Sequence, residues 1–278
     1  MDWGRLFDFS DYSELIPLVQ NSLIAGALLG LMGGLVGVFV MTRDMSFAVH
    51  GISELSFAGG AIALLVGLNV VLGAAVGSIM AAVIIGILGA KAKDRNSIIA
   101  VLMPFGLGIG ILALALHEGR AANKFGLLTG QIVAVDDPQL VWLVAISVLV
   151  IVSLLVIWRP LNFASLDVDV AEARGVPTRA LSIVFMLLLG LAVAAAVQIV
   201  GALLVMTLLV TPAAAALRVT SSPLLAPILS ILFATSAVVG GILLALGGGL
   251  PISPYVTTIS FLIYLVCRLI AYSRRVFA

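Results

Sequence analysis

The chain has 278 residues, of which 63% are hydrophobic and 10% are charged, and its formal net charge is +1. Soluble domains carry about a quarter charged residues, so this composition excludes a soluble protein and leaves little room for a soluble domain. The single cysteine, Cys267, excludes an intrachain disulfide and a cysteine-rich metal site. We therefore expect an all-α integral membrane protein that forms one transmembrane domain over residues 1–278.

Nine apolar runs follow one another along the chain, and a helical span needs about 20 such residues. They cover residues 14–41, 47–67, 69–90, 97–116, 139–158, 180–198, 200–217, 224–246 and 253–272. The stretch from Leu181 to Ala216 is one unbroken run without a charged residue, so it forms two spans only if the chain turns tightly near Gln198 to Gly201. A re-entrant element there would leave eight spans.

Basic residues predict the orientation, because cytoplasmic loops of membrane proteins carry an excess of lysine and arginine. With nine spans and an outer N-terminus, only Arg5, Arg120 and Lys124 of the 14 basic residues fall on the outer side. We expect a multi-pass protein of the inner (plasma) membrane in this orientation.

The first run carries glycines at four-residue spacing, namely Gly26, Gly30 and Gly34. Small residues at that spacing let two helices approach closely. The pattern predicts a tight helix contact along this face.

The second run contains two ionisable side chains, His50 and Glu54, which lie four residues apart and so on one face of a helix. Ionisable groups inside a span cost at least a few kcal/mol each and usually mark an ion or substrate path. A neutral imidazole and a carboxylate in this arrangement can share a divalent cation. The alternative is a pair that only stabilises helix packing. Asp44 could add an oxygen ligand if the start of the helix unwinds.

The longest polar stretch on the inner side runs from Arg159 to Arg179. Ser165 or Asp167 can cap a short helix that continues through Arg174, and Gly175 would end it. A short helix parallel to the membrane is typical of an element that docks on a cytosolic protein. A solvated connector is the alternative interpretation.

Three stretches together resemble the permease subunit of the ATP-binding-cassette importers for zinc, manganese and iron(II), the ABC-3 metal-ion family. Residues 43–60 resemble the family segment Asp-Ala-(Ile/Leu)-Ser-His-Ala-Val-Leu-Pro-Gly, residues 165–176 its ATPase-coupling loop, and residues 200–215 its Val-Gly-x-Leu-Leu-Val…Pro-Ala-Ala helix. The chain departs from the family at the site: His50 precedes Glu54, where the family has Asp four residues before His, and Phe57-Ala58 replace Leu-Pro.

The resemblance implies that the chain is not an enzyme but a subunit of an ATP-driven importer of divalent metal, without a permanently bound cofactor. Zinc is preferred as cargo because imidazole is a common zinc ligand, with manganese next and iron also accepted, and the lack of thiolates argues against copper(I). The metal ligands would be His50, Glu54 and Asp44. The residues that contact the ATPase would be Ser165, Asp167, Ala171, Glu172, Ala173 and Gly175.

The chain has no Gly-x-x-x-x-Gly-Lys-Ser/Thr loop for binding phosphate, so ATP hydrolysis is expected on another polypeptide. The resemblance implies as partners a second permease copy, cytosolic ATPase subunits and an extracytoplasmic metal-binding protein, in addition to lipid and without nucleic acid. A gradient-driven secondary transporter is the alternative, although the His50/Glu54 segment has no second copy. His117 beside Glu118 is either an entry ligand or an exposed loop residue without a role.

Overall fold

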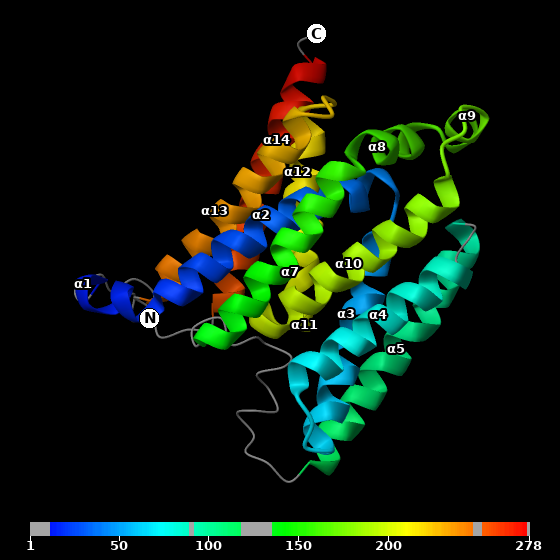
Figure 1. Ribbon diagram of the computed structural model, residues 1–278. Helices are drawn as coiled ribbons and strands as arrows, with labels where there is room; N and C mark the ends of the chain where they lie inside the picture. The colour runs from blue at the N-terminus through cyan, green and yellow to red at the C-terminus, as the bar shows by residue number, and fades with distance from the viewer. Residues whose placement is uncertain (1–11, 89–91, 118–134, 247–251, 277–278) are drawn as a thin grey trace. The chain divides into compact units, whose positions relative to one another are not determined.

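The computed structural model describes residues 12–88, 92–117, 135–246 and 252–276 (Figure 1). Within these ranges every regular element is a helix, which confirms the all-α prediction. The elements are α1 (Tyr12–Leu15), the 3₁₀ helix η2 (Ile16–Val19), α2 (Gln20–Thr42), α3 (Ser46–Leu65), α4 (Val70–Leu88), α5 (Ala92–Leu116), α7 (Asp137–Val156), α8 (Trp158–Leu166), α9 (Val168–Ala173), α10 (Thr178–Val200), α11 (Ala202–Leu209), α12 (Thr211–Val219), α13 (Leu225–Leu246) and α14 (Ile252–Val276).

Nine helical segments of the described residues are long and apolar enough to cross a membrane. They match the nine predicted runs and favour nine spans over eight. The segments are Ile16–Thr42, Ser46–Leu65, Val70–Leu88, Arg95–Leu116, Asp137–Val156, Thr178–Val200, Ala202–Val219, Leu225–Leu246 and Ile252–Arg274.

The apolar stretch from 181 to 216 is divided by one residue, Gly201, which lies between α10 and α11. Its φ of +80° is readily adopted only by glycine. This is the tight turn that the sequence required near residues 198–201. The following span is itself interrupted at Val210, and Pro212 then lies in the first turn of α12, where a missing N–H costs no helix hydrogen bond.

The chain divides into two compact units, and α2, α7 and α11 each pass from one unit to the other. The first unit comprises residues 1–38, 131–147 and 207–278, and the second comprises residues 39–130 and 148–206. A single permease domain over residues 1–278 stays a prediction.

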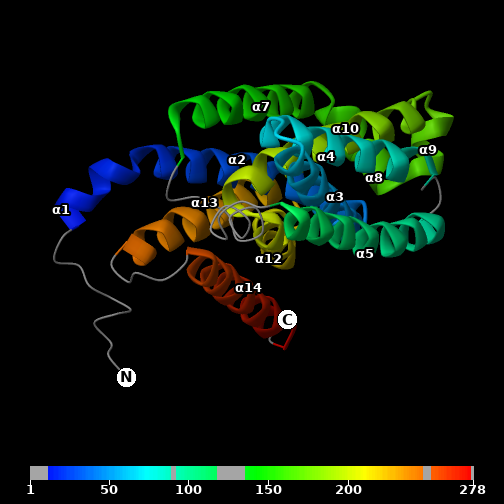
Figure 2. The same cartoon turned by 90° about the horizontal axis from the view of Figure 1, so that it is seen from below.

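In the first unit α2 packs closely against α13, and α12 and α14 pack on α13 and on each other (Figure 2). A Cβ atom at Gly30 would lie 2.6 Å from Thr235 Cα, and one at Gly34 would lie 2.6 Å from Ile231 Cα. Ser230 Oγ donates a hydrogen bond of 2.8 Å to the Gly34 carbonyl. The predicted close contact along the glycine face of α2 is therefore confirmed, and α13 is the helix on the other side of it.

In the second unit α3 packs against both α4 and α5, and α10 packs on α4 and α3. In the most apolar part of each span, 72% of α3 and 72% of α10 are buried, against 33% of α4 and 28% of α5. Because it packs against α4, α5 and α10, α3 is the central helix of this unit, and it carries His50 and Glu54.

Candidate functional site

One face of α3 lies directly on the backbone of α4. A Cβ atom at Gly77 would lie 2.2 Å from the Leu55 carbonyl oxygen, and one at Gly59 would lie 2.2 Å from the Gly73 carbonyl oxygen. Ser56 Oγ adds a hydrogen bond of 3.1 Å to the carbonyl of Ala74 on α4. In hydrocarbon such small residues and interhelical hydrogen bonds drive helix association, because lipid tails are as apolar as the side chains. These contacts fix the register of α3 against α4.

Helix α5 also approaches α3 closely, at the level of Glu54. A Cβ atom at Gly106 would lie 3.1 Å from the backbone carbon of Glu54, and one at Gly110 would lie 2.3 Å from the Phe57 ring. A contact at these two glycines was not predicted. Their four-residue spacing is the same signal that identified the packing face of α2.

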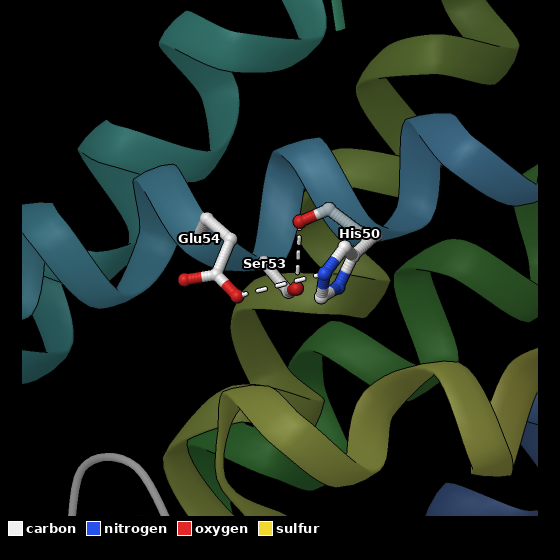
Figure 3. A network of polar contacts seen from close by, with 3 residues as sticks. All are labelled: His50, Ser53 and Glu54. Carbon is white, nitrogen blue, oxygen red and sulfur yellow. Dashed lines mark hydrogen bonds and ion pairs between the residues drawn. The ribbon is translucent and has the colours of Figure 1, made fainter. Parts of the chain in front are cut away.

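His50 and Glu54 project from α3 one turn apart, as predicted (Figure 3). The distance from His50 Nε2 to Glu54 Oε1 is 3.8 Å, and the side chains are 29% and 5% exposed. This distance is too long for a good hydrogen bond, which ends near about 3.2 Å. Two metal–ligand bonds of about 2 Å each span up to about 4 Å. The two atoms can therefore share one ion without a large movement.

Each member of the pair also has a buried polar atom with no hydrogen bond among the described residues. These atoms are His50 Nδ1 and Glu54 Oε2. Leaving a buried polar atom unsatisfied costs about 1–3 kcal/mol. Ser53 lies between the two residues, but its hydroxyl donates to the His50 carbonyl at 2.8 Å. Both side chains therefore have an atom left for a further partner, and the choice between metal ligands and packing groups stays a prediction.

Asp44 lies in the turn between α2 and α3 rather than on α3 itself. Its φ is +52°, a conformation that aspartate tolerates better than most residues, and its carbonyl accepts a 3.2 Å hydrogen bond from Arg95. In the described part of the chain no three His, Cys, Asp or Glu side chains gather into a metal-binding group. Asp44 therefore does not complete a three-ligand site within one chain, and its role as a ligand stays a prediction.

His117 directly follows α5, and its backbone N–H donates to the Ala113 carbonyl at 3.1 Å. Glu118, its proposed neighbour in an entry site, lies outside the described residues, as do Arg5, Arg120 and Lys124. The entry site stays a prediction.

The polar stretch that begins at Arg159 forms two short helices, α8 and α9 (Figure 1). Asp167 is the N-cap of α9, since its Oδ1 accepts a 3.0 Å hydrogen bond from the Val170 N–H. Gly175, at φ +80°, follows the C-cap as predicted. Ser165 was the other predicted cap, but it lies inside α8, where its hydroxyl donates to the Leu161 carbonyl at 2.6 Å. The predicted helix is thus shorter and begins after Asp167.

The remaining predicted coupling residues occupy different environments. Glu172 accepts a 2.5 Å hydrogen bond from Thr178 Oγ1 at the start of α10. Ala171 is fully buried, whereas Ala173 is exposed. Only Ala173 of these two alanines presents its side chain for contact with another protein.

Comparisons with known proteins agree with the resemblance. Residues 15–271 match the model of the ABC 3 transport family. The chain is 31% identical over 225 residues to the "Manganese transport system membrane protein MntC" of Listeria monocytogenes, covering 80% of each protein. It is 28% identical over 258 residues to the "Manganese import system permease protein ScaB" of Streptococcus gordonii, covering 92% of each.

The chain is also similar to a solved structure, "PsaBC from Streptococcus pneumoniae in complex with Fab". The TM-score is 0.82 at 26% identity, with 92% of this chain and 95% of that chain covered. Together with the nine apolar helices of the described residues, these matches identify a multi-pass protein of the plasma membrane that takes part in transport rather than in enzyme catalysis. The chain belongs to the ABC 3 transport family.

Proposed function

We propose that this chain is the permease subunit of an ATP-driven importer of divalent transition-metal ions, and that His50 and Glu54 line the path of the ion. The supporting observation is the pair itself: an imidazole nitrogen and a carboxylate oxygen lie 3.8 Å apart on α3, the helix on which α4, α5 and α10 all pack. Zinc, manganese and iron(II) all accept this ligand combination. The family's order of the two residues is reversed here, but the one-turn spacing is kept.

Manganese is our first choice for the cargo, followed by zinc and then iron. The zinc preference rested on imidazole chemistry alone, whereas the relatives described above are named as manganese systems. One chain offers only two ligands at this place, and a closed zinc site takes about four. A path must also release its ion, so incomplete coordination suits transport.

Other subunits supply what this chain lacks. The sequence has no phosphate-binding loop, so a cytosolic ATPase is needed for ATP hydrolysis. A second permease copy would complete the ligand set across a shared path, and an extracytoplasmic metal-binding protein would deliver the ion. The assignment of these partners is based on the chain's membership of the family.

The α8–α9 segment is the surface that we assign to the ATPase. Three large apolar side chains, Leu166, Val168 and Val170, are 86%, 52% and 45% exposed there. They lie outside the predicted spans and, in the predicted orientation, on the inner side, where a solvated connector would present polar groups instead. Their exposure favours a protein interface over a connector.

The transport proposal is tested by metal uptake into cells that carry the ATPase and the binding protein, with and without this chain. Uptake of manganese, zinc and iron is measured in parallel, and we expect chain-dependent accumulation of at least one, with manganese the strongest. An ATPase variant that binds but does not hydrolyse ATP should abolish it. Uptake that persists with that variant in an imposed ion gradient would instead support a secondary transporter, and no chain-dependent uptake of any of the three metals would refute metal transport.

A cysteine at Ala173 is expected to crosslink to the ATPase subunit, because this side chain is exposed on α9. The matched control is a cysteine at Ala171, which is buried on the same helix and should react only slightly. Both are made after replacing the native Cys267, and crosslinking is read on gels of the intact complex. Labelling of Ala173→Cys only from outside the cell would show that the contact and the orientation are both wrong.

A further inference from the structure

Arg43 lies in the turn between α2 and α3, and its guanidinium contacts two other helices. Nη1 donates to Ser165 Oγ on α8 at 3.3 Å, and Nη2 donates to Ser182 Oγ on α10 at 2.6 Å. The Ser165 hydroxyl is itself oriented by its bond to the Leu161 carbonyl, which leaves its oxygen free to accept from Arg43. The turn before the His50/Glu54 helix is thus tied to the last turn of α8.

An aromatic cluster supports the same side chain. The guanidinium carbon of Arg43 lies 5.6 Å from the centre of the Phe185 ring, within the range of a cation–π contact. Phe185 packs edge-on against Phe39 with ring centres 6.0 Å apart, and Phe39 packs against Trp158 of α8 at 5.1 Å. Burial, together with the nearby Arg95, lowers the pKa of the Arg43 guanidinium from its ordinary value. Arg43 is therefore a partly desolvated group held by packing as well as by hydrogen bonds.

The backbone of this turn is also fixed. Arg95 Nη2 donates to the carbonyls of Arg43 and Asp44 at 3.3 and 3.2 Å, and the Met45 N–H donates to the Val40 carbonyl at 2.8 Å. Helix α3 begins at Ser46, one turn before His50. A displacement of the turn would therefore move the first turn of α3, and with it the candidate ligand.

These contacts join the ends of three spans: Arg43 and Ser165 lie in the connections after the first and fifth spans, and Arg95 is the first residue of the fourth. Their meeting in one unit is expected if all three lie on the same side of the membrane. A guanidinium is a rigid fork that can hold two acceptors at once, which a lysine ammonium on a flexible stem does less well. Because Arg43 links α8 to the turn through a rigid group, a movement of α8 should displace the turn with it.

We propose that Arg43 is a positioning residue that transmits movement of the α8–α9 segment to α3, and so couples the ATPase to the His50/Glu54 site. The inference rests on the proposed function, since it assumes that an ATPase acts on this segment. It assigns to Arg43 a role in energy coupling that is separate from binding the ion.

The test uses the assembled transporter with its ATPase, in which a cysteine at Phe47 reports on α3. Phe47 is 62% exposed in the first turn of α3, and Cys267 is replaced so that only the reporter reacts. The rate of thiol labelling is measured with and without ATP, in the absence of transported metal. We expect ATP to change this rate in the parent protein, and we expect Arg43→Gln to lose the change while ATPase binding and ATP hydrolysis persist.

A second variant keeps the arginine and removes its acceptors. Ser165→Ala combined with Ser182→Ala leaves the contact with Phe185 intact, and it should also lose the ATP-dependent change. Arg43→Lys should restore only part of the response. The matched control is Arg179→Gln, which removes the same charge from an exposed position one turn before Ser182 on α10 and should respond like the parent.

An ATP response in Arg43→Gln and in the double serine variant equal to that of the parent would overturn the inference and leave the transport proposal standing. Equal losses of the ATP-dependent change in Arg43→Gln and Arg179→Gln would also overturn the inference. They would show that the response depends on positive charge in this region and not on the hydrogen bonds of Arg43. A parent protein that binds no ATPase would contradict the proposed function itself.

Discussion

Replacing His50 by alanine or Glu54 by glutamine is expected to lower metal uptake by at least about tenfold, because loss of a group that merely supports a metal ligand already costs about 10–100-fold in affinity. Both changes remove one ligand from the 3.8 Å pair and leave the other without its neighbour. Glu54→Gln also keeps the size of a side chain that is only 5% exposed, so packing should survive. Uptake is measured in cells with all partner subunits, at membrane levels of the chain matched by immunoblotting.

Two further variants sharpen this test. Ser53 lies between the two residues, but its hydroxyl donates a hydrogen bond to the His50 carbonyl within the same helix. The variant Ser53→Ala should therefore retain most of the uptake. The double variant His50→Asp with Glu54→His restores the order that the family carries, with nitrogen and oxygen ligands still one turn apart. It should recover much of the uptake that either single change loses. Full uptake by both His50→Ala and Glu54→Gln would show that the pair does not line the path of the ion.

The variant Gly77→Ala is expected to yield little folded protein, because its Cβ would lie 2.2 Å from the Leu55 carbonyl oxygen of α3. Backbone cannot move aside as a flexible side chain can, so α3 and α4 must separate. Overpacking of this kind costs about 1–3 kcal/mol or more. The measurement is the midpoint of thermal aggregation of the detergent-solubilised protein, together with its yield from membranes.

The matched control is Gly86→Ala on the same helix, where the added Cβ would meet Met186 side-chain atoms at 3.5 Å, an ordinary contact. Alanine also forms helix more readily than glycine by about 1 kcal/mol. Gly86→Ala should therefore be neutral or stabilising. Equal stability of the two variants would mean that α3 and α4 are not in close contact at Leu55.

The sequence alone was sufficient for the features that depend on local chemistry. Spans can be predicted from runs of apolar residues, because a single helix pairs nearly all of its own backbone N–H and C=O groups and so is stable in hydrocarbon. The turn near Gln198 to Gly201 and a cap at Ser165 or Asp167 were predictable because a break in a long helix and a helix N-cap have strong residue preferences. The spacing of His50 and Glu54 placed them on one face, and the 3.8 Å approach follows from that spacing.

Contacts between distant segments required the tertiary structure. The glycines of α2 predicted a close contact, but only the fold shows that α13 is the neighbour. Ser165 had the residue type of a cap, yet it became an acceptor for Arg43, which is 122 residues away in the sequence.

What the sequence by itself determined is therefore the helical content, the spans and the ionisable pair, since each depends on residues within a few turns of one another. What only the tertiary structure decided is which backbones touch at Gly77 and Gly106, and that the guanidinium of Arg43 lies between α8 and α10. The physical reason is that an apolar helix in lipid presents several similar faces, and small residues can accommodate any close neighbour. The choice among neighbours depends on the packing of all the helices in the unit at once.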